Sequence, residues 1–198
     1  MTINTKTLAA IDIGTNAIRL FISNVEEYPT ETLFKKIAFL RVPIRLGEDV
    51  FTTGEIGQQK GKRLCETMQG FSYIMSAFNV ESYKAYATCA MREARNGKSV
   101  AEQIQKECDL NVEIISGTKE AETIFAGGMN EVVDDDKTYL YVDVGGGSTE
   151  VIVYSKSVKV EACSFPLGTV RMLNNAVDKE EMKHFKKWLR NITEKYTP

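Results

Sequence analysis

Short apolar runs and amphipathic stretches alternate along the chain. Residues 7–13 and 18–25 are apolar runs joined by the turn GTNA, which predicts a β-hairpin, and residues 32–46 form a third predicted strand that ends in a turn at Gly47. From residue 54 to residue 78 apolar side chains recur every three or four positions, which predicts a helix with one face buried against a sheet. Further short strands and helices follow as far as about residue 130, so this part of the chain predicts a mixed α/β domain.

The hairpin pattern then occurs a second time. The segments IDIGTNAIRLFI and VDVGGGSTEVIV align without gaps, and they place Asp12 over Asp143 and Gly14 over Gly145, an offset of 131 residues (143 − 12). Each segment is a strand with an acid near its end, a turn of small residues and a returning strand. A single long offset excludes a solenoid of short repeats and predicts a duplicated domain.

A polar, acidic stretch at residues 134–137 separates the two halves and is interpreted as a linker. We therefore predict one domain over residues 4–133, with the first hairpin, and the start of a second over residues 137–198, with the second hairpin. Only one strong helix is predicted near the end of the chain, and Asp178 and Glu181 begin it as a capping pair. The second domain is thus expected to be incomplete in this chain, and uncovered apolar surface would favour a homodimer or a less stable fold.

Composition indicates an ordinary soluble protein. The chain has 198 residues, 43% hydrophobic and 26% charged, which is enough to bury a sizeable core. A net charge of −2 argues against a general nucleic-acid or membrane surface, and no apolar run approaches the roughly 18 residues of a transmembrane helix. The polar start MTINTKT has no secretory character, so a cytoplasmic location is expected. Four cysteines without CxxC spacing and a single histidine predict neither a zinc site nor a disulfide framework.

The two turns carry the candidate chemistry. A turn of Gly, Ser and Thr between strands presents backbone N–H groups and hydroxyls toward one point, which suits an anion such as phosphate. Asp12 and Asp143 would repel a bare phosphate, but they become useful if Mg²⁺ lies between carboxylate and phosphate oxygens. A plain glycine hairpin is the structural alternative, and the absence of a GxxxxGK[ST] sequence excludes a P-loop. The predicted phosphate-binding residues of the turns are Gly14, Thr15, Asn16, Gly145, Gly146, Gly147, Ser148 and Thr149.

Five motifs together resemble the exopolyphosphatase and guanosine pentaphosphate phosphohydrolase family of the actin-like superfamily. In chain order they are DIGTNAIRL, RLG, TCAMREARN, SGTKEAE and DVGGGSTE, and the resemblance runs from about Leu8 to Arg171. It implies duplicated actin-like (ribonuclease H-like) α/β domains, each with a mixed β-sheet and flanking helices. The first turn departs from the family's usual Ser-Asn-Ser, because this chain has Ala17 after Thr15 and Asn16 and so keeps only one hydroxyl.

The resemblance also implies roles for charged residues. Glu120 takes the position of the family's catalytic glutamate, although a glutamate in the first turn of a helix also has a simple structural explanation. Glu150 is implied to hold the metal or the water, with Asp143 beside it and Asp12 as the matching acid of the first hairpin. Arg92 is the candidate clamp, because a guanidinium group can bind phosphate oxygens in a bidentate manner, and a solvated arginine on a helix face is the structural alternative. The remaining charged residues near the motifs are left open: Arg19 either contacts substrate or braces the hairpin, and Lys119, Glu122 and Arg171 are surface or supporting residues.

The sequence thus predicts a hydrolase of phosphoanhydrides. The expected reaction is Mg²⁺-assisted attack of water on the terminal phosphate of inorganic polyphosphate or of guanosine pentaphosphate. The single histidine lies outside every phosphate motif and no cysteine neighbours a base, so no covalent nucleophile is expected. Two other classes stay open: an actin-like nucleotide-binding or kinase module, and a sensor that binds the alarmone or polyphosphate without hydrolysis.

Overall fold

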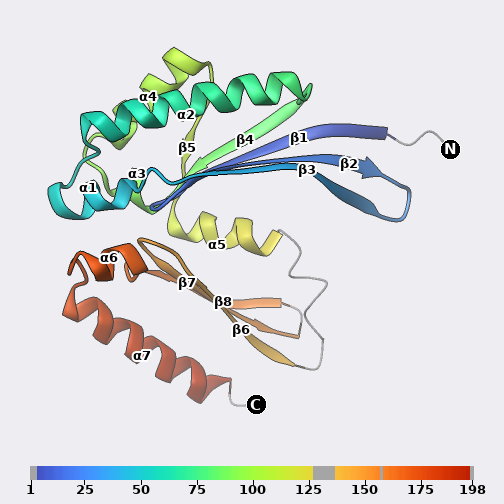
Figure 1. The fold of residues 1–198 in the computed structure, drawn as a ribbon. Helices are drawn as coiled ribbons and strands as arrows, with labels where there is room; N and C mark the ends of the chain where they lie inside the picture. The colour runs from blue at the N-terminus through green and yellow to red at the C-terminus, as the bar shows by residue number, and fades with distance from the viewer. Residues whose placement is uncertain (1–3, 127–136, 157, 197–198) are drawn as a thin grey trace. The chain divides into compact units, whose positions relative to one another are not determined.

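The computed structural model describes residues 4–126, 137–156 and 158–196, and these form two compact units, Met1–Ile114 and Ile115–Pro198 (Figure 1). The predicted linker lies outside the described residues except for Lys137, so that boundary stays a prediction. The compact units divide earlier, before helix α5 (Gly117–Ala126). Helix α5 groups with the second unit because Ala121 packs against apolar side chains of that unit's sheet.

The first unit is built on a five-stranded mixed sheet with the strand order β3-β2-β1-β4-β5. The predicted hairpin is confirmed, since Ile13 pairs with Ile18 across the turn. The third strand ends at residue 42 rather than 46, because Pro43 has no N–H for a sheet ladder and Arg45 adopts a left-handed backbone, with φ of 59°. The strands are β1 (Asn4–Ile13), β2 (Ile18–Glu27), β3 (Thr32–Val42), β4 (Ser82–Ala87) and β5 (Glu113–Ile114); β2 is antiparallel to its neighbours, and β1, β4 and β5 are parallel.

Helices α2 and α4 cover one face of this sheet (Figure 1). The apolar stripe predicted for the long helix is confirmed, because Leu64, Met68, Phe71 and Met75 of α2 are all buried. The helices of the unit are α1 (Leu46–Thr53), α2 (Gln58–Ala77), α3 (Cys89–Glu93) and α4 (Gly97–Cys108). Among the described residues, no helix is both long enough and apolar enough to cross a bilayer.

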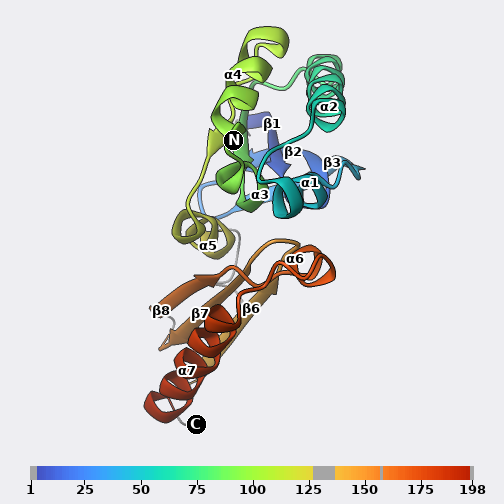
Figure 2. The ribbon, with the colours of Figure 1, turned by 90° about the vertical axis from the view of Figure 1, so that its left-hand side faces the viewer.

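The second unit is a three-stranded antiparallel sheet with a helix on each face (Figure 2). Helix α5 packs on one face, and α7 packs on the other around the ring of Phe165, whose centroid lies 4.9 Å from that of Phe185 and 5.6 Å from that of Trp188. Asp178 caps α7 by accepting the Glu180 N–H, as its position predicted. The elements after α5 are β6 (Thr138–Val144), β7 (Thr149–Ser155), β8 (Val158–Phe165), α6 (Thr169–Leu173) and α7 (Lys179–Lys195).

The duplication read from the sequence is present in the backbone. The pair Ile13–Ile18 closes the first hairpin, and its equivalent at the offset of 131 residues, Val144–Thr149, closes the second. The turn bonds are equivalent too: Gly14 N–H donates to the Ala17 carbonyl at 3.2 Å, and Gly145 N–H donates to the Ser148 carbonyl at 2.9 Å. The two turns therefore share one backbone geometry despite different side chains.

Candidate phosphate-binding and catalytic site

The first turn is held from one side by the segment that follows β3. The Thr15 carbonyl accepts the Gly47 N–H, and the Asn16 carbonyl accepts the Arg45 N–H, both at 2.9 Å. Within the part of the chain that the structure describes, the N–H groups of Thr15 and Asn16 have no acceptor. The turn therefore uses its carbonyls for structure and leaves these N–H groups available, which is what an anion site requires; anion binding by this turn stays a prediction.

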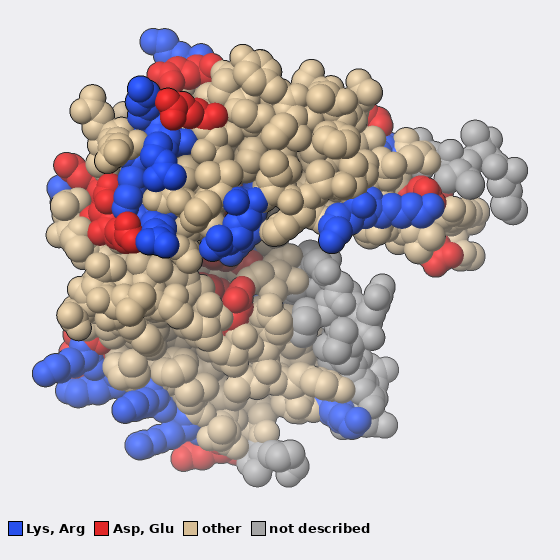
Figure 3. Space-filling model, in the orientation of Figure 1, with Lys and Arg blue, Asp and Glu red and all other residues tan. Residues whose placement is uncertain are grey.

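Ion pairs hold that bracing segment in place. Lys60 of α2 bonds to the Arg45 carbonyl at 2.8 Å and to the carboxylates of Glu48 and Asp49 of α1 at 2.9 and 2.7 Å. Basic and acidic side chains lie next to one another on the face of the first unit shown in Figure 3. The three contacts of Lys60 tie the start of α2 to the loop that supports the first turn, so the RLG motif has a structural explanation.

Asp12 and Arg92 lie at the same end of the first sheet as the turn. Asp12 is paired in register with Arg19 of β2, and the Arg19 guanidinium bonds to its carboxylate, which fits the bracing alternative for Arg19. The Thr88 N–H donates to the Ile13 carbonyl at 3.1 Å and thereby places the start of α3 beside the end of β1. That contact also places Arg92 at this edge. Arg92 is half-buried and lies in the last turn of α3.

The second turn is held in an equivalent way by the segment that follows β8. The Gly145 carbonyl accepts the Thr169 N–H at 3.0 Å, and the Gly146 carbonyl accepts the Val170 N–H at 2.8 Å. The N–H groups of Gly146 and Gly147 have no acceptor among the described residues. These two glycines, like Thr15 and Asn16, therefore present free N–H groups at the tip of a hairpin.

Thr149 differs from its predicted role as a phosphate ligand. Its side chain is buried, and its hydroxyl donates to the Leu167 carbonyl. A hydroxyl has one proton, so this bond leaves none for a phosphate oxygen. We therefore assign Thr149 to bracing the turn, whereas Ser148 has no such bond to a described residue.

Gly168 and Arg171 support the second turn, a role that the sequence left open for Arg171 and did not indicate for Gly168. The buried Arg171 side chain donates from Nε to the Gly147 carbonyl at 2.9 Å, so it is not a surface residue. A Cβ on Gly168 would lie 2.4 Å from the Gly146 carbonyl carbon and 2.5 Å from the Gly147 nitrogen. The only sequence signal was that LGTVR follows the second hairpin's third strand much as RLG follows the first one's.

Two acids lie together beside the second turn. Asp143 of β6 and Glu150 of β7 are register partners, so their side chains share one face of the sheet. Glu150 is only 2% exposed, and its Oε1 accepts the Ser164 hydroxyl at 2.8 Å, so its side chain does not face the solvent. The pKa of Tyr141, on the same face, is raised by burial and then by the charges of Asp143 and Glu150. A buried carboxylate next to a second one is a candidate for chemistry rather than for solubility.

Glu120 belongs to the same unit as this acid pair. Its helix α5 begins at the Ser116 hydroxyl, which accepts the Lys119 N–H at 3.1 Å. Ala121, the next residue, packs on Ile152 and Tyr154, which lie on the face of the sheet that carries Glu150. The structure therefore brings α5 to the acid-bearing face of the second sheet, with the Glu120 side chain half-buried.

The acids beside the second turn fit the predicted Mg²⁺ only as a site with few protein ligands. Among the described residues, no group of three or more His, Cys, Asp or Glu side chains is arranged to hold a metal ion. Mg²⁺, however, is usually held by one or two carboxylates together with water and substrate phosphate oxygens. The register pair of Asp143 and Glu150 supplies two carboxylates on one face, which agrees with that pattern.

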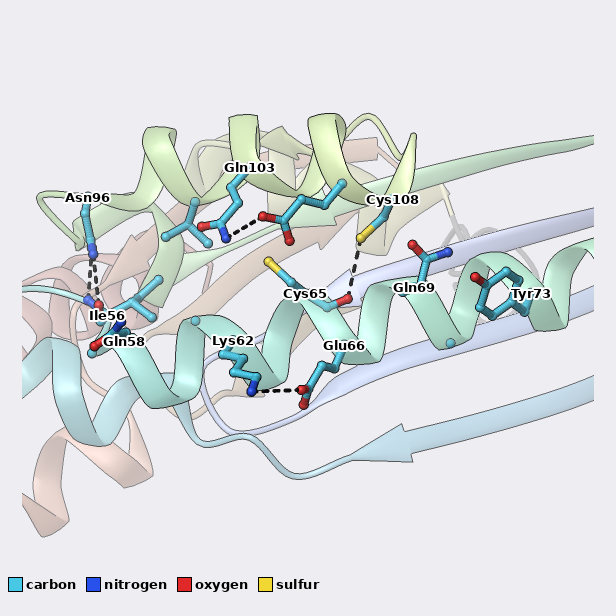
Figure 4. A pocket seen from close by; sticks show the side chains of 15 residues that line it. Ile56, Gln58, Lys62, Cys65, Glu66, Gln69, Tyr73, Asn96, Gln103 and Cys108 are labelled. Atoms are coloured by element: carbon cyan, nitrogen blue, oxygen red, sulfur yellow. Dashed lines mark hydrogen bonds and ion pairs between the residues drawn. The ribbon is translucent and has the colours of Figure 1, made fainter.

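A cavity of about 900 Å³ lies elsewhere, between α2 and α4 of the first unit (Figure 4). Its lining includes Cys65, Tyr73, Gln103 and Cys108, and none of the predicted site residues lines it. The Cys108 thiol donates to the Cys65 carbonyl at 3.5 Å across the floor of this cavity. The cavity is a groove in the helical layer and has no part in the candidate site.

Cys65 in this groove is expected to be an unreactive thiol. Burial, followed by the charge of Glu107, raises the Cys65 pKa from 9.0 to about 11. At pH 8 its thiolate fraction is then about 100-fold lower than that of an unperturbed thiol, so alkylation by iodoacetamide should be about 100-fold slower in folded than in unfolded protein. Mass spectrometry of the Cys65 peptide measures this rate.

The raised pKa of Cys65 also predicts how stability depends on pH. Because the unfolded thiol ionises near pH 9 and the folded one near pH 11, the free energy of unfolding should fall as pH rises between these values.

The duplicated sheets and their equivalent hairpins define a mixed α/β protein of the actin-like fold, as predicted. A match to a family model identifies the family within this fold class. The chain belongs to the Ppx/GppA phosphatase family, whose model matches residues 21–198. The resemblance carried by the five motifs is thereby confirmed.

Individual relatives agree with the family. The chain is 31% identical over 168 residues to a bifunctional 3-dehydroquinate synthase/phosphatase of Fusobacterium nucleatum, covering 83% of this chain and 25% of that protein. It is 29% identical over 170 residues to exopolyphosphatase 2 of Mycobacterium tuberculosis, covering 83% and 53%. The solved structure of an exopolyphosphatase from Cytophaga hutchinsonii is similar with a TM-score of 0.77 and 26% identity, covering 95% of this chain and 61% of that one. The chain thus spans about half or less of the length of these curated relatives.

Proposed function

We propose that this protein hydrolyses the terminal phosphoanhydride bond of inorganic polyphosphate, of guanosine pentaphosphate or of both. The observation that carries the proposal is the second hairpin, where two free glycine N–H groups adjoin the buried carboxylate of Glu150. The names of similar proteins, among them exopolyphosphatase 2 of Mycobacterium tuberculosis, support the polyphosphate substrate. Guanosine pentaphosphate is proposed from the sequence motifs alone.

In this mechanism the hairpins bind and the acids act on water. The N–H groups of Gly146 and Gly147 would hold phosphate oxygens, and those of Thr15 and Asn16 would do the same in the first unit. Arg92 would neutralise a further pair of oxygens through its guanidinium group. The backbone donors are fixed before substrate arrives, because hydrogen bonds hold both turns to the segments after β3 and β8, so their binding needs little reorganisation.

Glu120 and Glu150 would control the attacking water. Glu120 is proposed to orient the water and accept its proton as the oxygen attacks phosphorus, and the leaving phosphate chain departs with the electrons of the anhydride bond. Glu150, fixed by the Ser164 hydroxyl, would hold a second position near the reacting group together with Asp143. Mg²⁺ bound by Asp143, Glu150 or Asp12 would neutralise charge on the phosphate oxygens.

The presence of Glu120 and Glu150 favours hydrolysis over binding alone, because a sensor needs no carboxylate to orient water. A kinase-like module would use the same hairpins for a nucleoside triphosphate and transfer the phosphate to a second substrate. That alternative would release no free phosphate, because the phosphate passes to the second substrate. The homodimer expected from the sequence stays a separate proposal.

The test is phosphate release by this 198-residue chain from polyphosphate and from guanosine pentaphosphate, each with Mg²⁺ and with excess EDTA. We expect colorimetric phosphate release with at least one substrate, and its loss on chelation. A thermal shift with ATP but no free phosphate from either substrate would favour the kinase-like module. Binding of either substrate by calorimetry without phosphate release would leave only the sensor.

A further inference from the structure

The first turn and Arg92 belong to segments that are far apart in the sequence. The turn is bonded to the residues just before and just inside α1, whereas Arg92 lies in the last turn of α3. Helix α3 has only five residues, and so short a helix is not stable by itself. Its position therefore depends on contacts with other segments.

Asn96 makes such a contact with the loop that follows α1. Its Oδ1 accepts the Ile56 N–H and its Nδ2 donates to the Ile56 carbonyl, both at 2.9 Å (Figure 4). The two bonds are partly buried, and together they satisfy both backbone groups of Ile56 as a neighbouring strand would. Replacing Asn96 would leave these backbone groups without their partners.

Arg95 adds three bonds to the same loop. Its N–H donates to the Gly54 carbonyl and its Nη2 to the Thr53 carbonyl, both at 3.0 Å, and Nη2 also pairs with Glu55 at 3.3 Å. A Cβ at Gly54, where φ is 79°, would collide with the Arg95 guanidinium. Each residue from 53 to 56 thus bonds to Arg95 or Asn96, and we call this set of contacts the α1–α3 junction.

The α1–α3 junction completes a continuous connection from the first turn to Arg92. Helix α1 begins at Leu46, between the two residues whose N–H groups bond to the turn, and it ends at Thr53, where the junction begins. On the other side α3 ends two residues before Arg95. The distance between the turn and Arg92 is therefore set through α1 and the junction as well as through β1.

We propose that Asn96 is a positioning residue, which holds Arg92 at the place where one phosphate chain contacts both its guanidinium group and the N–H groups of the first turn. The inference rests on the proposed function, in which Arg92 binds phosphate oxygens. A structural role alone would make Asn96 important for stability and independent of Arg92. Positioning instead makes the effect of Asn96 on binding depend on the presence of the Arg92 guanidinium.

This dependence is measured by a double-mutant cycle, with calorimetric binding of tripolyphosphate in excess EDTA so that no turnover occurs. Arg92→Ala should weaken binding about 10- to 100-fold, the range for a lost hydrogen bond to a charged group. Asn96→Ala should weaken it about 10-fold, because a displaced guanidinium group binds poorly. Adding Asn96→Ala to Arg92→Ala should cause no further loss. Losses that multiply in the double variant, or full binding by Asn96→Ala, would overturn the proposal.

Tyr83→Phe is the matched control for the loss of a hydrogen bond. The Tyr83 hydroxyl accepts the Asn111 N–H at 2.8 Å, and Tyr83 lies at the opposite end of β4 from the residue that pairs with Ile13. Tyr83→Phe should therefore keep full binding of tripolyphosphate. Equal weakening in Tyr83→Phe and Asn96→Ala would indicate a general loss of stability and would contradict positioning.

Arg95→Lys tests the junction if Asn96→Ala does not fold. Arg95 is exposed and lysine keeps its charge, but lysine lacks the forked donors that bond to both Thr53 and Glu55. Binding should weaken in Arg95→Lys and should not weaken further when this change is added to Arg92→Ala. Full binding by Arg95→Lys, or losses that multiply, would contradict the junction's role.

Phosphate release from polyphosphate, measured with Mg²⁺ in the same variants, separates this proposal from the proposed function. If the unaltered chain binds tripolyphosphate with the expected dependence on Arg92 but releases no phosphate, the hydrolase proposal fails and positioning by Asn96 stands. If the unaltered chain releases phosphate and Asn96→Ala does so at the same rate, positioning fails alone. A chain that does not bind tripolyphosphate would overturn both.

Discussion

Replacing Glu150 with glutamine is expected to lower phosphate release by about 10²- to 10⁴-fold, the range found when a positioned acid or base is removed. Glu150 is buried at 2% exposure beside Asp143, on the acid-bearing face of the second sheet. Loss of its negative charge removes a group that holds water or metal, and the amide cannot accept a proton in its place. The measurement is the rate of phosphate release from polyphosphate at saturating Mg²⁺.

The same substitution should leave the fold intact. Glutamine has nearly the volume of glutamate, and its amide oxygen can accept the Ser164 hydroxyl that now bonds to Oε1 at 2.8 Å. Removing a buried charge while keeping its hydrogen bond does not raise the cost of burial, so the melting temperature should be unchanged or higher. A loss of activity with an unchanged melting temperature separates chemistry from stability.

Glu161→Gln is the matched control for Glu150→Gln. Glu161 lies on the neighbouring strand β8 and bonds to Lys195 of α7 at 2.6 Å, on the face away from α5. Its partner is well exposed, so the pair contributes little stability. Phosphate release by Glu161→Gln should equal that of the unaltered chain. Full activity of Glu150→Gln would remove this residue from the mechanism, whereas equal losses in both variants would indicate a general effect of charge.

Local patterns predicted much of this fold because the interactions concerned are local. The hairpin around GTNA follows from two apolar runs and a short turn, and the α2 stripe follows from a period that buries Leu64 and Met68. The duplication was also predictable, since two aligned hairpins with one offset need no information about packing. Family membership added the expectation that acids lie beside the turns, and Asp143 and Glu150 lie in register there.

Contacts between distant segments could not be predicted in the same way. Nothing in the pattern of residues 165–171 indicates that Arg171 is buried and bonds to the Gly147 carbonyl. Thr149 was assigned to phosphate from the chemistry of its hydroxyl, but the Leu167 carbonyl, 18 residues away, takes its proton. The grouping of α5 with the second unit likewise depends on Ala121 packing against a sheet that forms later in the chain. In each case the outcome depends on which distant segment the residue contacts in the folded chain, and the local sequence does not contain that information.

A single methyl group on Gly168 should disable the second turn. The Cβ of Gly168→Ala would lie 2.4 Å from both the carbon and the oxygen of the Gly146 carbonyl and 2.5 Å from the Gly147 nitrogen, where contacts below 3.0 Å require something to move. These are backbone atoms, so relief requires the turn itself to shift by at least 0.6 Å (3.0 − 2.4). A displacement approaching 1 Å at a reacting group costs about 10²-fold in rate, and overpacking costs about 1–3 kcal/mol of stability. We therefore expect phosphate release to fall about 10- to 100-fold, together with a lower melting temperature.

Gly70→Ala separates this steric effect from the general effect of adding a methyl group to glycine. A Cβ on Gly70, within α2, would meet nothing within 4 Å, and alanine in a helix interior is more stable than glycine by about 0.5–1 kcal/mol. Gly70→Ala should therefore raise the melting temperature and keep full activity. The turn shifts in Gly168→Ala because its carbonyls already accept the Thr169 and Val170 N–H groups and hold it against α6. If Gly168→Ala kept full activity and stability, the N–H groups of Gly146 and Gly147 would not need this position, and the phosphate site would have to lie elsewhere.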